Sequence, residues 1–240
     1  MIGVVIGSFG MPSAVALNVA AIHYFNNPSI PVLVHDDSTP PDRDPCGYFL
    51  RKHDGFELYR TPGQMGHVTG DIHCFIHGLK WAREKGLKYL VKISQRFIFI
   101  EQDWLLKAVK QADSEQAITL SQPAAHYGVW PWGKNSIRTE CVLMRVEEWS
   151  RPEIFEAILS HHVTPELSIR IVAEMNVHPG KPIGRLRLFG PSKSERRQGL
   201  LWHDSNSPEE YQAIGKRLNV ETEGYHNHGW VHVLGHQYRI

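Results

Sequence analysis

Residues 2–13 read Ile-Gly-Val-Val-Ile-Gly-Ser-Phe-Gly-Met-Pro-Ser, an apolar run that ends in a glycine-containing turn. Pro12 suits the first position of a helix, and residues 13–24 continue as an Ala-rich stretch with helical periodicity. The stretch therefore predicts a strand, a turn and a helix.

The same alternation of strand and helix continues to residue 112. Further strand signals fall at residues 31–35, 55–59 and 89–100, and further helix signals at residues 69–85 and 102–112. Thr69 is a candidate N-cap, and Gly86 stops the helix that follows it. Because helices that separate strands favour parallel pairing with crossovers, the sequence predicts an α/β fold, a three-layer sandwich with a mostly parallel central sheet.

The second half of the chain is less regular. Strands are expected at residues 117–120 and 141–146, and helices at residues 152–159, 165–175 and 208–218. Prolines and glycines between residues 178 and 199 predict an irregular C-terminal lobe. We expect one domain over residues 1–240, built from a first half (1–112) and a second half (113–240).

The composition fits a compact domain. Hydrophobic residues make up 42% of the 240 residues, enough for a substantial core. The 26 basic and 25 acidic residues nearly cancel, which gives no support to bulk nucleic-acid or membrane binding. The chain enters a strand at once, which leaves no room for a signal peptide, and no run approaches the ~18 apolar residues of a membrane span. We expect a cytoplasmic protein whose three cysteines are small buried hydrophobes: Cys46, Cys74 and Cys141.

Candidate site residues, most of them polar, follow three of the predicted strands. Ser8 and Phe9 follow the first strand, Asp36 and Asp37 follow the second, and a Ser-Gln-Arg step at residues 94–96 interrupts the fourth. Ligands of open α/β sheets bind beyond the carboxyl ends of strands, where carboxylates can accept hydrogen bonds from a base or ribose. The two aspartates also have favourable turn chemistry, so both interpretations stay open. The step contains no acid, whereas a divalent metal would need carboxylate ligands there.

Several blocks of the first 112 residues carry a resemblance to a known family. In order and spacing they resemble the successive blocks of a family 2-like glycosyltransferase with the GT-A fold: Val4-Val5-Ile6-Gly7-Ser8-Phe9, Val32-Leu33-Val34-His35-Asp36-Asp37-Ser38-Thr39, Gly66-His67-Val68-Thr69-Gly70-Asp71, Gly78-Leu79, Trp81-Ala82 and Lys88-Tyr89-Leu90-Val91. The resemblance implies a GT-A-like domain that moves a sugar from a nucleotide diphosphate sugar to a hydroxyl of a glycan or other acceptor. It makes residues 1–112 the nucleotide-binding half and residues 113–240 the acceptor-side half. The nucleotide contacts that it implies are Ser8, Phe9, Asp36 or Asp37, and Asp71.

The chain departs from this family at its metal motif. The family usually places Asp-x-Asp after the fourth strand, where this chain has Ser94-Gln95-Arg96. A metal-independent subset of such enzymes stabilises the leaving diphosphate with Lys and Arg, which form charge-assisted hydrogen bonds with phosphate. Lys92 and Arg96 are therefore predicted to bind diphosphate, although Arg96 could equally pair with an acid such as Asp103. No cofactor is expected, and Mn²⁺ or Mg²⁺ is left open but disfavoured.

A basic loop at residues 181–197 is a second source of cations. It holds six basic residues against Glu195: Lys181, Arg185, Arg187, Lys193, Arg196 and Arg197. We expect Lys181, Arg185, Lys193 and Arg196 to bind diphosphate when the loop closes. A solvated loop is the alternative, and a local nucleic-acid patch is a weaker one.

Transfer with inversion needs a general base near the acceptor hydroxyl. Glu140 and Glu166 are the candidates, although Glu166 at a helix start could also serve the helix dipole. Trp130 and Trp132, in a long irregular loop, are candidates for stacking on an acceptor sugar, with core filling as the equal alternative.

The 15 histidines raise the question of a metal site. His73 and His77 lie four apart but lack the glutamate of His-Glu-x-x-His, so we expect surface histidines. The histidine- and aromatic-rich tail is interpreted as a lid or packing strand in which zinc is left open: Tyr225, His226, His228, Trp230, His232, His236 and Tyr238. Two other functions stay open, an inactive nucleotide-sugar or glycan-binding protein of the same fold and, less favoured, a nucleotidyltransferase.

Overall fold

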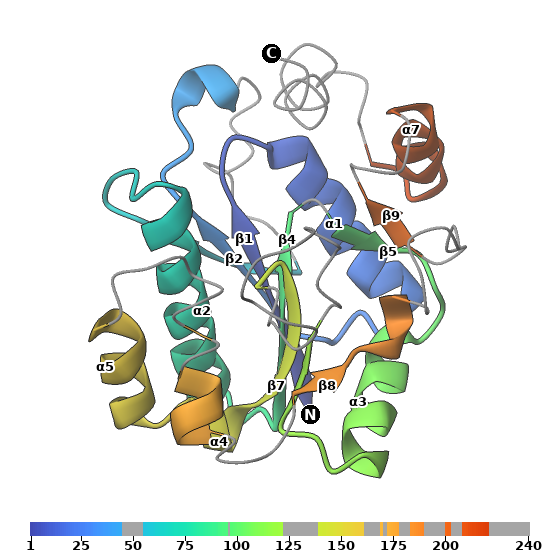
Figure 1. The fold of residues 1–240 in the computed structure, drawn as a ribbon. Coiled ribbons are helices and arrows are strands. Elements are labelled where there is room, and N and C mark those ends of the chain that lie inside the picture. Colours follow the sequence, from blue (N-terminus) through green and yellow to red (C-terminus); the bar gives the residue numbers. More distant parts are fainter. Residues whose placement is uncertain are drawn as a thin grey trace, which may run out of the picture.

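The computed structural model describes residues 1–44, 55–95, 97–121, 139–160, 169, 172–177, 183–189, 200–202 and 208–220. Its centre is a seven-stranded sheet in the order β3-β2-β1-β4-β7-β6-β8 (Figure 1). The strands are β1 (Ile2–Ser8), β2 (Val32–Asp36), β3 (Glu57–Arg60), β4 (Tyr89–Ser94), β6 (Thr119–Ser121), β7 (Cys141–Arg145) and β8 (Gly184–Arg185). Only β7 runs antiparallel to its two neighbours in this sheet. The predicted α/β class with a mostly parallel sheet is confirmed.

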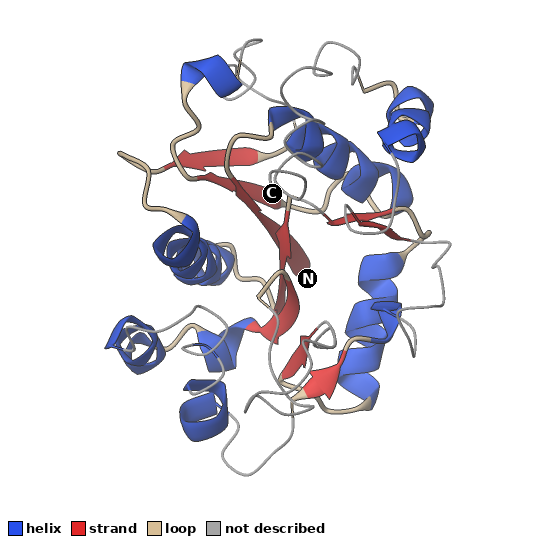
Figure 2. Ribbon diagram, turned by 45° about the horizontal axis from the view of Figure 1, so that its top comes forward, coloured by secondary structure: helices blue, strands red, loops and turns tan. Residues whose placement is uncertain are grey.

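Helices cover both faces of the sheet, as Figure 2 shows. On one face, Val4 and Ile6 of β1 pack in a core with α1 (Pro12–Phe25) and α3 (Trp104–Ser114). On the other face, Val5 packs with α2 (His67–Glu84), α4 (Val146–Trp149) and α5 (Pro152–Ser160). Successive side chains of a strand point to opposite faces, so one short run supplies both cores. The result is the expected three-layer sandwich.

Helix α2 lies unusually close to β1. A Cβ atom on Gly78 would stand 2.7 Å from Cγ1 of Val5, and one on Gly7 would stand 3.3 Å from Sγ of Cys74. The small residues therefore allow the helix and the strand to approach. This approach brings the first turns of α2 beside the ends of β1 and β2.

Two local predictions were wrong. Helix α2 begins at His67 with Gly66 as its N-cap, so Thr69 is not the cap. The predicted strand at residues 89–100 is two strands, because β4 ends at Ser94 and β5 (Phe97–Phe99) pairs with β9 (Leu200–Trp202) in a separate sheet. The start of α2 and the division into β4 and β5 both depend on contacts with residues distant in the chain, which local periodicity does not show.

The C-terminal lobe contains short elements that the sequence did not predict. They include β8, β9 and the 3-10 turn η4 (Arg187–Phe189). Before them, η3 (Ala173–Val177) is a π-helical turn, and after them α7 (Pro208–Arg217) agrees with the predicted helix at residues 208–218. Cys74 and Cys141 are free and buried as expected, and Cys46 lies outside the described residues. No helix in the described part of the chain has the length and apolarity needed to cross a membrane.

Candidate functional site

The polar residues that follow the strands meet at one edge of the sheet. In the strand register, Ser8 is opposite Asp36, and Gly7 is opposite Ser94. Glu140 precedes the antiparallel β7, so it reaches the same edge, where its carbonyl accepts a 2.6 Å hydrogen bond from the Ser94 N–H. The structure thus brings together the ends of β1, β2 and β4 with the start of β7.

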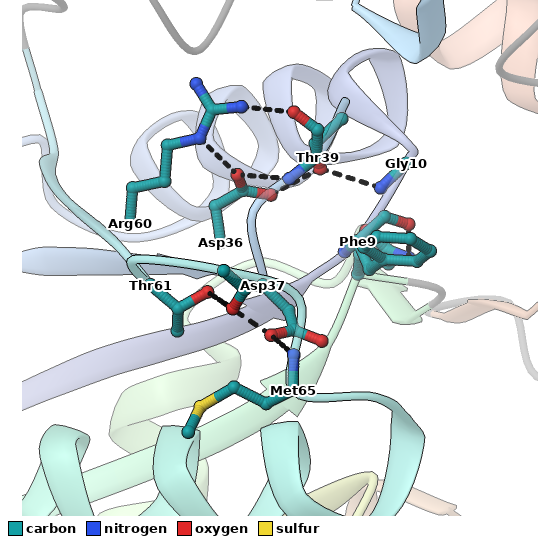
Figure 3. A network of polar contacts seen from close by, with 10 residues as sticks. Phe9, Gly10, Asp36, Asp37, Thr39, Arg60, Thr61 and Met65 are labelled. Carbon is teal, nitrogen blue, oxygen red and sulfur yellow. Dashed lines mark hydrogen bonds and ion pairs between the residues drawn. The ribbon is translucent and has the colours of Figure 1, made fainter. Parts of the chain in front are cut away.

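Asp36 is fully buried and lies where the loop after β2 meets the β1–α1 turn and strand β3 (Figure 3). Its carboxylate accepts hydrogen bonds from the Thr39 N–H, at 2.9 Å, and from the Thr39 hydroxyl, and it lies 3.5 Å from Nε of Arg60. The same Thr39 hydroxyl accepts a 2.8 Å bond from the Gly10 N–H. Burial raises the pKa of Asp36, although Thr39 and Arg60 act in the opposite direction. Asp36 therefore ties the loop after β2 to the β1–α1 turn and to β3.

Asp37 anchors the start of α2. Its carboxylate accepts hydrogen bonds from the N–H groups of Met65 at 2.8 Å and Gly66 at 3.0 Å, with the Thr61 hydroxyl at 3.3 Å (Figure 3). The backbone N–H of Asp37 donates to the Ser8 carbonyl at 2.9 Å. A carboxylate that satisfies two amides ahead of a helix does the work of an N-cap from a distant part of the chain. Nucleotide contacts of Asp36 and Asp37 stay a prediction, and any such contact would add to these structural bonds.

Gln95, in the acid-free step after β4, pairs with the turn after β1. Its Oε1 accepts from the Phe9 N–H, and its Nε2 donates to the Phe9 carbonyl, both at 3.0 Å. Its backbone N–H also donates to the Gly7 carbonyl at 3.1 Å. The β1–α1 turn is therefore fixed to the acid-free step at the end of β4.

The residues at this position do not fit a metal held by acidic side chains. Ser94 and Gln95 offer no carboxylate, and the Gln95 amide oxygen is already bonded to Phe9. Across the described ranges, no group of three or more His, Cys, Asp or Glu residues could hold a metal ion. Mg²⁺ and Mn²⁺ prefer carboxylate and other oxygen ligands, which this step does not assemble.

Lys92 and Asp71 form an ion pair beneath the edge. Lys92 is 1% exposed, and its ammonium donates to the Asp71 carboxylate and, at 2.6 Å, to the Thr139 carbonyl. Burial opposes the charge on Lys92, but the carboxylates of Asp71 and Glu140 outweigh it and raise the pKa of Lys92. Lys92, predicted to bind diphosphate, and Asp71, predicted to contact the nucleotide, are thus bonded to each other on the α2 side of the sheet.

Of the remaining predicted residues, Arg185 alone lies within the described part of the chain. Arg185 ends β8, which is separated from β4 by β7 and β6, so the usual strand spacing puts it roughly 14 Å away. Seven candidates lie outside the described residues: Arg96, Trp130, Trp132, Glu166, Lys181, Lys193 and Arg196. The histidine-rich tail lies outside them as well.

Sequence reasoning missed several residues of the edge. Thr39, Arg60 and Thr61 bond to the carboxylates of the two aspartates. The sequence analysis treated Gln95 only as part of a step without acidic residues and did not predict its bonds to Phe9. His77, expected at the surface, is partly exposed, and its ring packs 3.9 Å from that of Tyr59 and 5.4 Å from that of His35. Position directly after a strand was the signal available for Thr61, whereas the His35–His77 contact has no local sequence signal.

Comparison with known proteins supports the fold assignment at low sequence similarity. No protein-family model matches the chain, and no curated protein matches its sequence. The sheet and its helices are nevertheless those of GT-A glycosyltransferases. An active-site mutant of LgtC superposes with a TM-score of 0.54 at 11% identity, covering 96% of this chain and 100% of that one.

Two further solved structures give the same result. S. aureus TarS in complex with UDP-GlcNAc has a TM-score of 0.51 at 13% identity, covering 98% of this chain and 70% of that one. The bifunctional glycosyltransferase WbbM has a TM-score of 0.52 at 9% identity, covering 90% of this chain. The chain spans 44% of WbbM, less than half its length. At such identities the likeness establishes the fold alone.

Proposed function

We propose that the chain is a glycosyltransferase that moves a sugar from a nucleotide diphosphate sugar to a hydroxyl of a glycan or other acceptor. The observation that carries the proposal is the meeting of Ser8, Phe9, Asp36 and Asp37 with the end of β4 and with Glu140 at one edge of a GT-A sheet. Ligands of open α/β sheets bind at this edge. The UDP-GlcNAc complex of TarS, a protein of the same fold, supports the donor class.

We further propose that the transfer needs no Mn²⁺ or Mg²⁺. The absence of an acid at Ser94 and Gln95 supports this, as does the bonding of Gln95 to Phe9. When the bond between the anomeric carbon and the diphosphate oxygen breaks, the diphosphate leaves with the electron pair and gains charge. Arg96 would stabilise that charge through charge-assisted hydrogen bonds, together with Lys181, Lys193 and Arg196 of the basic loop.

Of the two candidate bases, Glu140 is the one that lies within the described residues. Its backbone is bonded to the end of β4, and the positive charge of Lys92 lies close enough for Glu140 to affect the pKa of that lysine. In an inverting transfer, its carboxylate would take the proton of the acceptor hydroxyl as the hydroxyl oxygen attacks the anomeric carbon. Glu166 is the second candidate, and Trp130 and Trp132 are proposed to stack on the acceptor sugar.

Calorimetric titration with UDP- and GDP-sugars, with EDTA or with added Mn²⁺, tests the donor and the metal. We expect binding of at least one nucleotide sugar that EDTA leaves unchanged. Absence of binding to any nucleotide sugar would overturn the function, and binding abolished by EDTA would overturn the metal-free part only. For the base, Glu140→Gln should abolish transfer while donor binding remains. Glu147→Gln, an exposed glutamate of α4, is the matched control.

A binding protein of the same fold without turnover is the second candidate. The acid-free step favours it, and so do the structural bonds that occupy the carboxylates of Asp36 and Asp37. It predicts donor binding without transfer and without donor hydrolysis. Detectable transfer or hydrolysis that is lost in Glu140→Gln would exclude it.

A further inference from the structure

The guanidinium of Arg43 lies over the ring of Phe9, 5.3 Å from its centroid. Arg43 ends the 3-10 turn η1 (Pro41–Arg43) in the loop after β2, whereas Phe9 lies in the β1–α1 turn. A Cβ atom on Gly10 would stand 3.1 Å from Cδ of Arg43, and Gly10 has a φ of 65°. Glycine at this position therefore lets the arginine stem cross the turn, so that two loops of the edge meet at a cation.

No acid neutralises this cation within the described part of the chain. Arg60, which also lies at this edge, is bonded to Asp36 and Thr39, whereas Arg43 makes neither an ion pair nor a side-chain hydrogen bond with any described residue. A ring face attracts the charge of a guanidinium but leaves most of its five N–H donors unused. Arg43 is only partly exposed. It is thus a positioned cation with donors available to a ligand.

Two hydroxyls that flank this turn, at the end of β1 and the start of α1, also lack a partner among the described residues. Ser8 is 6% exposed and Ser13 is 1% exposed, and neither hydroxyl oxygen has a hydrogen-bond partner among the described residues. Buried polar groups are normally paired, so unpaired ones call for an explanation. The helix that follows, α1, has no side-chain cap at Met11. A cation, two hydroxyl donors and a helix N-terminus without a side-chain cap are all complementary to an anion.

We propose that Arg43 binds the phosphate groups of a nucleoside diphosphate at the β1–α1 turn, with Phe9 as the platform that holds its guanidinium. The inference deepens the function proposed above and rests on it for the nucleoside part of the ligand. It assigns the anion contact to the loop after β2, in a residue that the family motifs do not cover. The guanidinium supplies charge-assisted, paired hydrogen bonds, which a lysine cannot reproduce in geometry.

The test compares ligands with and without phosphate. Binding of UDP, GDP, uridine, guanosine and inorganic pyrophosphate is measured by calorimetry for the wild type, Arg43→Gln and Arg43→Lys. We expect Arg43→Gln to weaken binding of pyrophosphate and of the nucleoside diphosphate roughly tenfold or more, with Arg43→Lys intermediate. Affinity for the nucleoside should change less than about twofold, because a nucleoside offers no charge for the arginine to bind.

Arg217→Gln is the matched control. The Arg217 guanidinium lies over the rings of Phe25 and Tyr24, at 5.2 and 5.4 Å, so it also has aromatic support. Phe25 is the last residue of α1, which puts Arg217 one helix length, roughly 20 Å, from the turn. This variant should bind every ligand as the wild type does. Phe9→Leu, which keeps the charge and removes the ring, should weaken pyrophosphate binding less than Arg43→Gln, and it replaces that variant if Arg43→Gln does not fold.

The outcomes separate the two proposals. Unchanged diphosphate and pyrophosphate affinity in Arg43→Gln overturns the role of Arg43 while the transferase function stands. An equal loss for the nucleoside and the diphosphate also overturns it, because the effect would then not depend on phosphate. Arginine-dependent pyrophosphate binding without any nucleotide binding supports the anion contact and overturns the transferase. Absence of binding to pyrophosphate and to both nucleoside diphosphates overturns both.

Discussion

The side-chain amide of Gln95 and the backbone of Phe9 form two reciprocal hydrogen bonds, each 3.0 Å long. In this pairing the amide acts as one further residue of the β1–β4 ladder, beyond the point where both strands end. The turn that follows β1 is thereby held by the step that follows β4. A substitution in the turn after β1 or in the step after β4 should therefore also destabilise the other segment.

Gln95→Glu tests this coupling. A carboxylate cannot donate to the Phe9 carbonyl, so one bond is replaced by two facing acceptors. We expect the free energy of unfolding, measured in urea, to fall by about 1–2 kcal/mol. Gln64→Glu, in the exposed loop before α2, is the matched control and should change little. Equal stability of the two variants would contradict the coupling.

Asp37→Ala removes the acceptor of two backbone N–H groups. The amides of Met65 and Gly66 would lose their partner, and we expect a loss of roughly 2–3 kcal/mol in the free energy of unfolding. Hydrogen exchange at these two amides should accelerate more than exchange in β1. Asp42→Ala, an exposed aspartate of η1, should leave both measurements unchanged. Unaltered exchange at Met65 and Gly66 would show that other groups hold the start of α2.

The contrast between these bonds and the sequence shows which parts of the fold were predictable. Strands β1, β2 and β4 and helices α1 and α3 follow from apolar periodicity, because each is a local pattern buried on a defined face. Asp37 and Met65 are separated by 28 positions, and no local pattern links an aspartate in a turn to an amide so far along the chain. The predicted cap at Thr69 was wrong for this reason.

The candidate site divides in the same way. The positions of Ser8, Asp36 and Ser94 at one edge were predictable, because parallel strands end together. The partners of their side chains were not, because they depend on loop conformation. Lys92 illustrates this, since strand parity buries it against α2 and pairs it with Asp71.

Lys92→Met tests the buried pair. Removal of the ammonium leaves the Asp71 carboxylate without its partner, and such a loss costs about 3–5 kcal/mol in buried pairs. Asp71 is 20% exposed, so we expect the lower end of that range. The double variant Lys92→Met with Asp71→Leu should recover part of the loss in chemical denaturation. The control is Lys88→Met, which breaks the exposed pair with Asp113 and should have little effect. A double variant no more stable than Lys92→Met would contradict a compensating charge pair.

The contact between His35 and His77 predicts a stability that depends on pH. His35 is 2% exposed, and its Nε2 has no hydrogen-bond partner among the described residues. Burial, with smaller effects from His77 and His73, lowers the pKa of His35 from 6.5 to about 4, while Asp37 opposes the shift. The ring of Tyr59 packs against both histidine rings. The folded chain therefore holds His35 neutral where the unfolded chain would protonate it.

The sign of the effect follows from proton binding. Between pH 6.5 and about 4 the unfolded state binds a proton at His35 that the folded state does not, so acidification favours unfolding. The stabilisation is fully present above pH 6.5 and is lost as the pH falls toward 4, a change on the order of 3 kcal/mol.

Free energies of unfolding measured across this window should show a smaller slope for His35→Phe than for the wild type. Burial of Phe at this site keeps the volume but removes the titrating group. His77→Gln removes the smaller charge effect of that ring and should reduce the slope by less, because burial of His35 remains. Parallel pH profiles of His35→Phe and the wild type would mean that His35 is protonated in the folded state at its ordinary pKa.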